Sequence, residues 1–277
     1  MVGGHDGRSC LKAAEMYDGS EGGWRALPDM TIARSACGAA RVERNLYVMG
    51  GHDGGSCLKS AEMYDGSAGQ WRALPDMSVV RSACAAVCMD GNVCVMGGHN
   101  SSTLKSAEMY DRSVDEWRAL PDMNVARHGC AAVCIEGNVC VVGGYGGAYL
   151  TTAEMYDRSA GLWRTLPPMH YARSGCAAVG VEGHLYVMGG HDGDYYLNSA
   201  EIYDGSAGKW RMLPNMSVER FGCAAACVEA NVYVVGGQAG TAKLASVECY
   251  DPIAHEWRTL PSMSTARSFC AAVVGHE

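Results

Sequence analysis

Residues Asn45–Arg81 decide the fold of this chain. They read NLYVMGGHDGGSCLKSAEMYDGSAGQWRALPDMSVVR. The same pattern recurs along the whole chain, about 47 residues apart. Every copy carries a diglycine, a tyrosine, a tryptophan and an arginine in the same order; the tryptophans are Trp24, Trp71, Trp117, Trp163, Trp210 and Trp257. A fixed period of this length predicts a solenoid, a propeller or an array of repeats.

Short β-rich segments alternate with turn residues inside each copy. In the third copy we expect strands over Ser82–Met89, Val93–Met96, Ala107–Tyr110 and Trp117–Leu120. Glycine and aspartate separate these segments, which predicts a four-stranded antiparallel meander. Six such sheets around an axis predict an all-β, six-bladed propeller with four antiparallel strands per blade. The whole chain, residues 1–277, is expected to form this single domain.

The two ends of the chain are predicted to complete one blade together. Residues Ser268–Val274 copy an innermost strand, whereas Met1 already lies within a second strand. We therefore expect the C-terminal strand to complete the N-terminal blade. The alignment places about three residues of the repeat outside the chain at this junction, so the second strand of this blade should be very short.

Composition excludes several classes of function. The net charge of −8 is spread over all repeats, with no basic stripe that would predict nucleic-acid binding. No apolar run is long enough to cross a membrane. Because Met1 already lies inside a repeat, we expect no signal peptide. A cytoplasmic location follows as an expectation. The fourteen cysteines include one three residues after each repeat arginine, and the type is readily buried, so packing rather than metal binding is expected.

The diglycine, the E-x-Y-D segment, the tryptophan, and the L-P-x-M segment before the arginine together resemble the kelch repeat. The resemblance covers essentially all of the chain, six times over. It implies a protein-interaction module, in many members the substrate-recognition part of a cullin-3 ubiquitin-ligase adaptor. The BTB and BACK domains of those adaptors do not occur in this sequence. Other members bind actin or assemble cytoskeletal complexes, and a few are copper oxidases or a sugar epimerase.

Two sets of loops should share one face of the propeller, and the resemblance implies that partners bind there. One set follows each diglycine, and the other follows each repeat arginine. Departures from the repeat mark the candidate surface, because aromatic residues supply much of the binding energy of interfaces. The candidate partner-binding residues are His5, His52, His99, His128, Tyr145, Tyr149, Ser174, His191, Tyr195, Tyr196, Phe221, Gln238, Ser268 and Phe269.

Alternative roles for these residues remain open. The histidines after the diglycines could form a ring that binds metal or senses pH, or they could be repeated loop residues a blade-width apart. The aromatic residues could instead plug the mouth of the channel. A catalytic site would need His128, His191 and a tyrosine to converge. The sequence contains no G-x-S-x-G, P-loop or H-E-x-x-H motif, and we expect neither an enzyme, a cofactor nor a metal.

The expected function is therefore binding of a partner peptide or protein surface on the loop face. Only Arg8 and Lys243 offer positive charge in these loops, so a strongly acidic partner is not expected. A role in a cullin-3 complex through domains outside this sequence, or a cytoskeletal role with actin, are the narrower forms of this function. The repeat arginines, and the glutamates of the E-x-Y-D segments, occur in six equivalent copies and should have structural roles.

Overall fold

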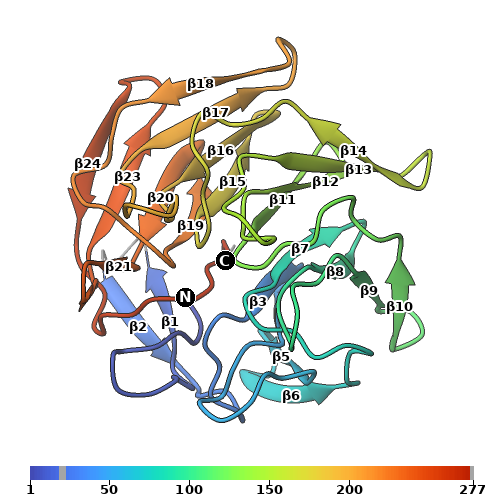
Figure 1. The fold of residues 1–277 in the computed structure, drawn as a ribbon. Helices are drawn as coiled ribbons and strands as arrows, with labels where there is room; N and C mark the ends of the chain where they lie inside the picture. The colour runs from blue at the N-terminus through green and yellow to red at the C-terminus, as the bar shows by residue number, and fades with distance from the viewer. Residues whose placement is uncertain (19–22, 275–277) are drawn as a thin grey trace.

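Antiparallel strands make up each repeat in the computed structural model, which describes residues 1–18 and 23–274 (Figure 1). Five four-stranded sheets occur among these residues. Their strands are β3–β6 (Gly38–Val42, Asn45–Met49, Ala61–Asp65, Gln70–Leu74), β7–β10 (Ala85–Met89, Asn92–Met96, Ala107–Asp111, Glu116–Leu120), β11–β14 (Ala131–Ile135, Asn138–Val142, Ala153–Asp157, Leu162–Leu166), β15–β18 (Ala177–Val181, His184–Met188, Ala200–Asp204, Lys209–Leu213) and β19, β20, β23 and β24 (Ala224–Val228, Asn231–Val235, Val247–Asp251, Glu256–Leu260).

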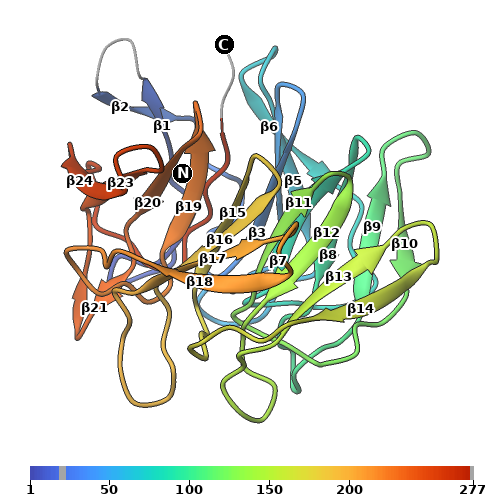
Figure 2. The ribbon, with the colours of Figure 1, turned by 90° about the horizontal axis from the view of Figure 1, so that it is seen from above.

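Two short sheets complete the topology of the described residues. β1 (Ala14–Asp18) pairs with β2 (Gly23–Leu27), and β21 (Gln238–Ala239) pairs with β22 (Ala242–Lys243) in a loop. No helix in the described part of the chain is long and apolar enough to cross a membrane. The sheets surround a central axis, and the chain begins near the centre of the view (Figure 1). Figure 2 shows the same ring of strands turned by 90°.

The strand sequences explain their order from the axis outward. The innermost strand β7 consists of small and apolar residues with alternating burial, whereas β8 is buried on both faces except at its first residue. β10, at the outer edge, is largely exposed. The predicted inner strand begins three residues later than expected, at Ala85, because Ala83 has a φ of 52° that a β-strand does not tolerate. Small residues fit the crowded axis, and the large tryptophans lie on the outermost strands.

A closed ring of main-chain hydrogen bonds joins the repeats at the axis, within the described residues. It is formed by the residues that immediately precede the cysteine found three positions after each repeat arginine. The amide N–H of each residue donates to the carbonyl oxygen of the equivalent residue in the neighbouring repeat, with N–O distances of 2.7–2.8 Å. The bonds run from Ala83 to Ala36, Gly129 to Ala83, Gly175 to Gly129, Gly222 to Gly175, Phe269 to Gly222, and Ala36 to Phe269. The last two bonds join the C-terminal segment to both of its neighbours. The repeats are therefore linked as a closed cycle at the axis.

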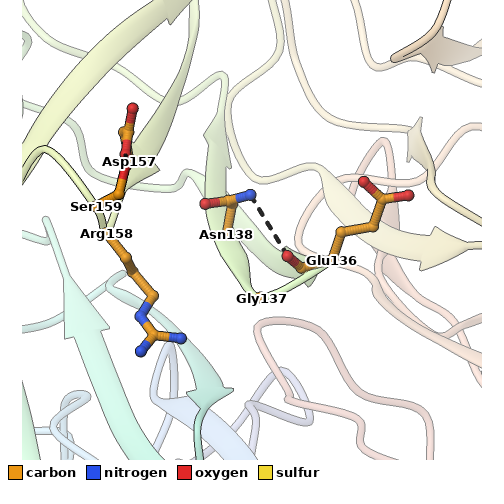
Figure 3. Close-up of a pocket in the computed structure, with 6 residues that line it drawn as sticks. All are labelled: Glu136, Gly137, Asn138, Asp157, Arg158 and Ser159. Atoms are coloured by element: carbon orange, nitrogen blue, oxygen red, sulfur yellow. Dashed lines mark hydrogen bonds between the residues drawn. The ribbon is translucent and has the colours of Figure 1, made fainter.

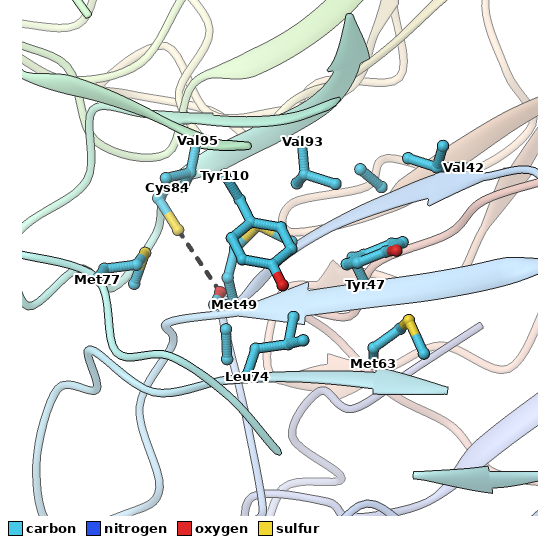
Figure 4. Close-up of a cluster of buried hydrophobic side chains, with 12 residues drawn as sticks. Val42, Tyr47, Met49, Met63, Leu74, Met77, Cys84, Val93, Val95 and Tyr110 are labelled. Atoms are coloured by element: carbon cyan, nitrogen blue, oxygen red, sulfur yellow. Dashed lines mark hydrogen bonds between the residues drawn. The ribbon is translucent and has the colours of Figure 1, made fainter. Parts of the chain in front are cut away.

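Apolar side chains fill the space between adjacent sheets. Figure 4 shows the cluster between sheet β3–β6 and sheet β7–β10, in which Tyr47, Met49 and Met63 face Val93, Val95 and Tyr110. Most of these side chains are almost completely buried, and burial of each apolar side chain stabilises the fold by roughly 1.5–3 kcal/mol. Equivalent clusters recur around the ring.

A buried arginine–glutamate pair joins each sheet to the loop that precedes it, as Arg127 and Glu154 illustrate. The main chain of Arg127 is bonded to the preceding repeat. Its N–H donates to the carbonyl oxygen of Leu104 at 2.9 Å, and its carbonyl oxygen accepts from the amide of Gly98 at 2.7 Å. Its guanidinium contacts the following sheet, with Nη2 2.9 Å from Glu154 Oε1 and Nη1 2.8 Å from the carbonyl oxygen of Gly143. The equivalent pairs are Arg34–Glu62, Arg81–Glu108, Arg173–Glu201, Arg220–Glu248 and Arg267–Glu15.

The prediction of six four-stranded blades was wrong, because residues 1–18 and 23–274 form five. The sixth position is occupied by the two-stranded sheet β1–β2. The C-terminal segment was expected to complete this blade as a strand, but Ala271 forms only an isolated bridge with Val2, which also bridges Ala14. Where the other repeats have five residues of second strand, only Met1 and Val2 precede this diglycine. A ladder extends only where both partners continue, so the four-stranded arrangement does not form.

The seam beside β1 lacks a second contact that the other repeats have. The indole Nε1 of each later tryptophan donates to a proline carbonyl of the preceding repeat, for example Trp71 to Pro28 at 2.8 Å. Trp24 Nε1 is buried without a partner among the described residues. The amino group of Met1 donates to Glu15 O at 2.7 Å, and its burial lowers the pKa to about 6. Among the described residues, this seam therefore lacks the tryptophan–proline hydrogen bond that joins the other repeats.

We expect Arg127→Met to reduce the free energy of unfolding by about 3–5 kcal/mol, because it leaves Glu154 buried without its counter-charge. Lys105→Met is the matched control. Lys105 pairs with Asp122 at 3.3 Å on the exposed surface, and its loss should cost less than about 1 kcal/mol. Chemical denaturation measures both values. Equal effects would contradict the role assigned to the buried pair.

Extending the chain with Met-Asn-Leu-Tyr before Met1 should stabilise it by about 2 kcal/mol, because the added leucine and tyrosine continue the ladder along β1 as Leu46 and Tyr47 do along β5. The same extension should also remove a pH dependence of the free energy of unfolding. The buried amino group of Met1 has a pKa of about 6 in the folded chain and about 8 in the unfolded chain. The unfolded chain therefore binds more protons between these values, and stability falls as the pH falls from 8 to 6.

A Met-Gly-Ser-Gly extension is the control for that experiment. It moves the charged amine away from Glu15 but supplies no strand residues. It should abolish the pH dependence of the free energy of unfolding without the added stability. If the two extensions stabilise the protein equally, strand pairing along β1 is not the cause.

Candidate functional site

The loops on one side of the ring form three concentric rows, which together we call the loop face. In the fourth sheet, Ser174 and His191 exchange main-chain hydrogen bonds of 2.9 and 2.8 Å, and His191 also bridges Tyr196. The inner row is Ser268, Ser35, Ser82, His128, Ser174 and Phe221. The middle row is His5, His52, His99, Tyr145, His191 and Gln238. The outer row is Cys10, Cys57, Thr103, Tyr149, Tyr196 and Lys243.

A compact turn holds the middle and outer rows together. In the second repeat, Asp53 Oδ1 accepts hydrogen bonds from the amides of Gly55 and Ser56 at 2.8 and 2.7 Å. These bonds lower the pKa of the Asp53 carboxyl. His52 Nδ1 accepts from the amide of Gly54 at 3.0 Å, so the ring nitrogen that remains free to donate is Nε2. Gly54 has a φ of 106°, as the Asp-Gly turn requires.

The aromatic side chains predicted from the sequence form one continuous series of ring contacts, here called the aromatic arc. Successive ring centroids lie 5.0–5.5 Å apart from His99 to His128, Tyr145, Tyr149, His191 and Tyr196, and onward to Phe221 and Phe269. The arc crosses the loops of four consecutive four-stranded sheets and ends at the C-terminal segment. The structure therefore brings these predicted residues together.

Two of the rings cover the backbone at the mouth of the channel. A Cβ on Gly175 would lie 2.5 Å from the Phe221 ring, and one on Gly222 would lie 2.9 Å from the Phe269 ring. Tyr196 stacks on Phe221 with ring planes only 7° apart. Phe269 also lines a channel cavity of about 90 Å³, together with the ring of cysteines. Phe269 therefore fits the alternative in which aromatic residues plug the mouth of the channel, whereas the rings farther out along the arc lie beyond the channel.

The predicted site residues differ in their access to solvent. Tyr195 is 72% exposed and Tyr149 36%, whereas Tyr145, Tyr196, Phe221 and Phe269 are half-buried. Ser174 and Ser268 are buried, which removes them from direct contact with a partner. Tyr171, 45% exposed in the loop before Ser174, was missed because a single tyrosine outside the two predicted loop positions gave no signal. The outer row could have been found from its recurrence four or five residues after the middle row.

The other half of the loop face is polar. His5 and His52 lie there with Cys10 and Cys57, the two free thiols of its outer row. At its boundary with the arc, Thr103 Oγ1 lies 3.1 Å from His128 Nδ1. Burial, with a smaller contribution from His99, lowers the pKa of His128. Among the described residues, no group of three or more His, Cys, Asp or Glu side chains is placed to hold a metal ion.

A depression on the opposite face has a volume of about 350 Å³. Figure 3 shows that it is formed by residues 136–138, which are the β11–β12 turn and the first residue of β12, and by residues 157–159, which are the last residue of β13 and the start of the turn after it. Two of its three charged groups are already engaged. Asp157 accepts from Ser159, Ala160 and Arg164, which lowers its pKa to about 2, and Arg158 pairs with Asp90. These contacts stabilise turns, and the carboxylate of Glu136 is the third charged group of the lining.

Repeated sheets around a channel, with their loops gathered on one face, define a β-propeller. Residues 121–277, more than half of the chain, match the KLHDC2/KLHL20/DRC7 Kelch-repeats domain. Residues 33–78 and 81–124 each match the Kelch motif. The chain belongs to the kelch-repeat family, whose propellers are general protein-interaction modules. No curated protein matches it in sequence.

The close approach of Phe221 to Gly175 can be tested with a double-mutant cycle. Ala36 and Ala83 occupy equivalent ring positions with φ near 53°, so an alanine backbone is tolerated there. We expect Gly175→Ala to cost about 1–3 kcal/mol in the wild type, because the added methyl displaces the Phe221 ring. In the Phe221→Ser background the same change should cost less than about 1 kcal/mol. Identical costs in both backgrounds would place the ring elsewhere.

Proposed function

We propose that this propeller binds a partner peptide or protein surface on its loop face, centred on the aromatic arc. The observation that carries the proposal is the concentration of rings on one side of an otherwise repetitive face. At equivalent positions the polar half has Ser35, Cys57 and Ser82, whereas the arc has Phe221, Tyr149 and Tyr196. Rigid aromatic side chains supply large contact areas at low cost in conformational entropy.

The framework beneath the arc supports binding without large rearrangement. Main-chain bonds fix all three rows, and the rings contact one another in series. A preorganised surface loses little conformational freedom when a partner binds, so more of the interaction energy appears as affinity. Binding rather than catalysis fits the arc, because its departures from the repeat add aromatic rings and one imidazole, His128, whose hydrogen-bond partner among the described residues is Thr103 and not a carboxylate.

The kelch resemblance implies two narrower roles. One is substrate recognition for a cullin-3 ubiquitin-ligase adaptor, and the other is association with actin or other cytoskeletal proteins. The identity of a captured partner distinguishes them, and co-sedimentation with filaments would favour the second. For either role the predicted face is the same, with His5, His52 and Gln238 at the margins of the arc.

The proposal is tested by affinity capture from a lysate of the source organism. Tyr149→Ala/Tyr196→Ala/Phe221→Ala removes three rings of the arc, and the captured partners should fall at least about tenfold because interface energy concentrates in such residues. The matched control, Cys10→Ala/Cys57→Ala/Ser35→Ala, changes two outer-row residues and one inner-row residue in the polar half and should retain most of the capture. Thermal melting verifies that both variants fold. Recovery of the same partners by the arc variant would show that the face is wrong.

A further inference from the structure

Carboxylates flank the aromatic arc at Tyr149, its most exposed ring. The turn formed by residues 192–195 packs against Tyr149, since a Cβ on Gly193 would lie 3.1 Å from Cδ2 of that ring. Asp194 is exposed within this turn, next to Tyr195, the most exposed ring of the face. Within residues 1–18 and 23–274, no ion pair or side-chain hydrogen bond engages the Asp194 carboxylate.

Two further carboxylates extend this negative region. Asp192 Oδ1 accepts from the amides of Asp194 and Tyr195 at 2.9 and 2.8 Å. Partial burial acts to raise the pKa of Asp192, but these amide donors outweigh it and lower the pKa. Glu219 lies in the neighbouring loop, where Oε1 accepts from the amide of Gly240 at 3.2 Å. All three carboxylates therefore lie around the outer side of the arc.

The basic groups near the arc are already engaged. Arg127, Arg173 and Arg220 are fully buried and paired with glutamates of their sheets. Lys243 hydrogen-bonds with Gln238, and its Nζ lies 5.9 Å from the centroid of the Phe269 ring. The molecule thus already places one ammonium group over a ring of the arc. Near the middle of the arc, the ring of Tyr149 and the neighbouring ring of Tyr195 are exposed beside Asp194, and no cation of the described residues lies over either ring.

We propose that the segment bound at the arc carries arginine or lysine, with its cation beside Asp194 and against Tyr149 and Tyr195. This inference rests on the proposed function and names the class of partner. A ring face attracts a cation, and a nearby carboxylate adds a charge-assisted hydrogen bond, for which the flat guanidinium is the better match. The adjoining rings of Tyr196 and Phe221 then accommodate an apolar or aromatic neighbour in the same segment. Complementary charge selects for basic partners over acidic ones.

The probe is a phage-displayed library of random twelve-residue peptides, selected against the wild-type protein. Enriched peptides are then synthesised with a fluorescent label, and their affinity is measured by polarisation. We expect enrichment of arginine or lysine together with apolar or aromatic residues. Affinity should fall about fivefold in Asp194→Asn and more than about twentyfold in Asp194→Lys, and it should weaken as the salt concentration rises.

Asp53→Asn is the matched control. It removes one carboxylate from the polar half of the same face, and the asparagine side-chain oxygen can keep the hydrogen bonds of the turn. It should leave the affinity within about twofold of the wild type, because it lies away from the arc. An equal loss in Asp53→Asn and Asp194→Asn would show a general charge effect and overturn the proposal.

The outcomes separate this inference from the proposed function. Neutral or acidic peptides that lose affinity in the Tyr149→Ala/Tyr196→Ala/Phe221→Ala variant would keep the face and overturn the basic partner. Peptides indifferent to those three changes, or no enriched sequence, would overturn both. Sedimentation velocity tests a different occupant: a dimer that disappears on Tyr149→Ala would identify a second copy of the chain and also overturn the proposal.

Discussion

Each inter-blade loop is attached to the following sheet by a buried guanidinium and a buried carboxylate, and the rest of the structure depends on this pairing. Burying either charge alone is costly. Here every nitrogen of Arg127 has an acceptor, and Glu154 also accepts amides of the loop, Asn124 and Val125. Because the main chain of the same arginine bonds to the preceding repeat, one residue fixes the relative placement of two sheets. The loop face inherits its rigidity from this arrangement, since its inner row begins at the next residue.

Much of the architecture could be predicted from the repeat alone. The period, the positions of the turns and the placement of Trp117 on an outer strand follow from local residue types, and the structure agrees. The sixth blade could not be predicted correctly, because its formation depends on pairing between distant segments. The inner-strand sequence is present in residues 271–274, but Val2 offers Ala271 only a single bridge. A strand-like sequence without a partner of equal length does not produce a blade.

The sequence located the loops that form the candidate site but not the access of their side chains to solvent. The inner and middle rows follow from fixed offsets after the arginine and the diglycine. Burial of Ser174 depends on the close approach of Gly129, whose hypothetical Cβ would lie 2.7 Å from the serine Oγ. The outer row depends on loop length, which is one residue shorter for His99–Thr103 than for His52–Cys57. Such tertiary and length effects are invisible to a pattern that treats all repeats as equivalent.

The three rows are joined by main-chain atoms, so the framework does not depend on which side chains occupy them. Serine, histidine and phenylalanine share the inner row, and cysteine, threonine, tyrosine and lysine share the outer row, on the same backbone. The surface is consequently modular. Evolution or an engineer can replace recognition residues one sector at a time, or transfer a whole set to the next sector around the axis, while the supporting scaffold keeps its geometry.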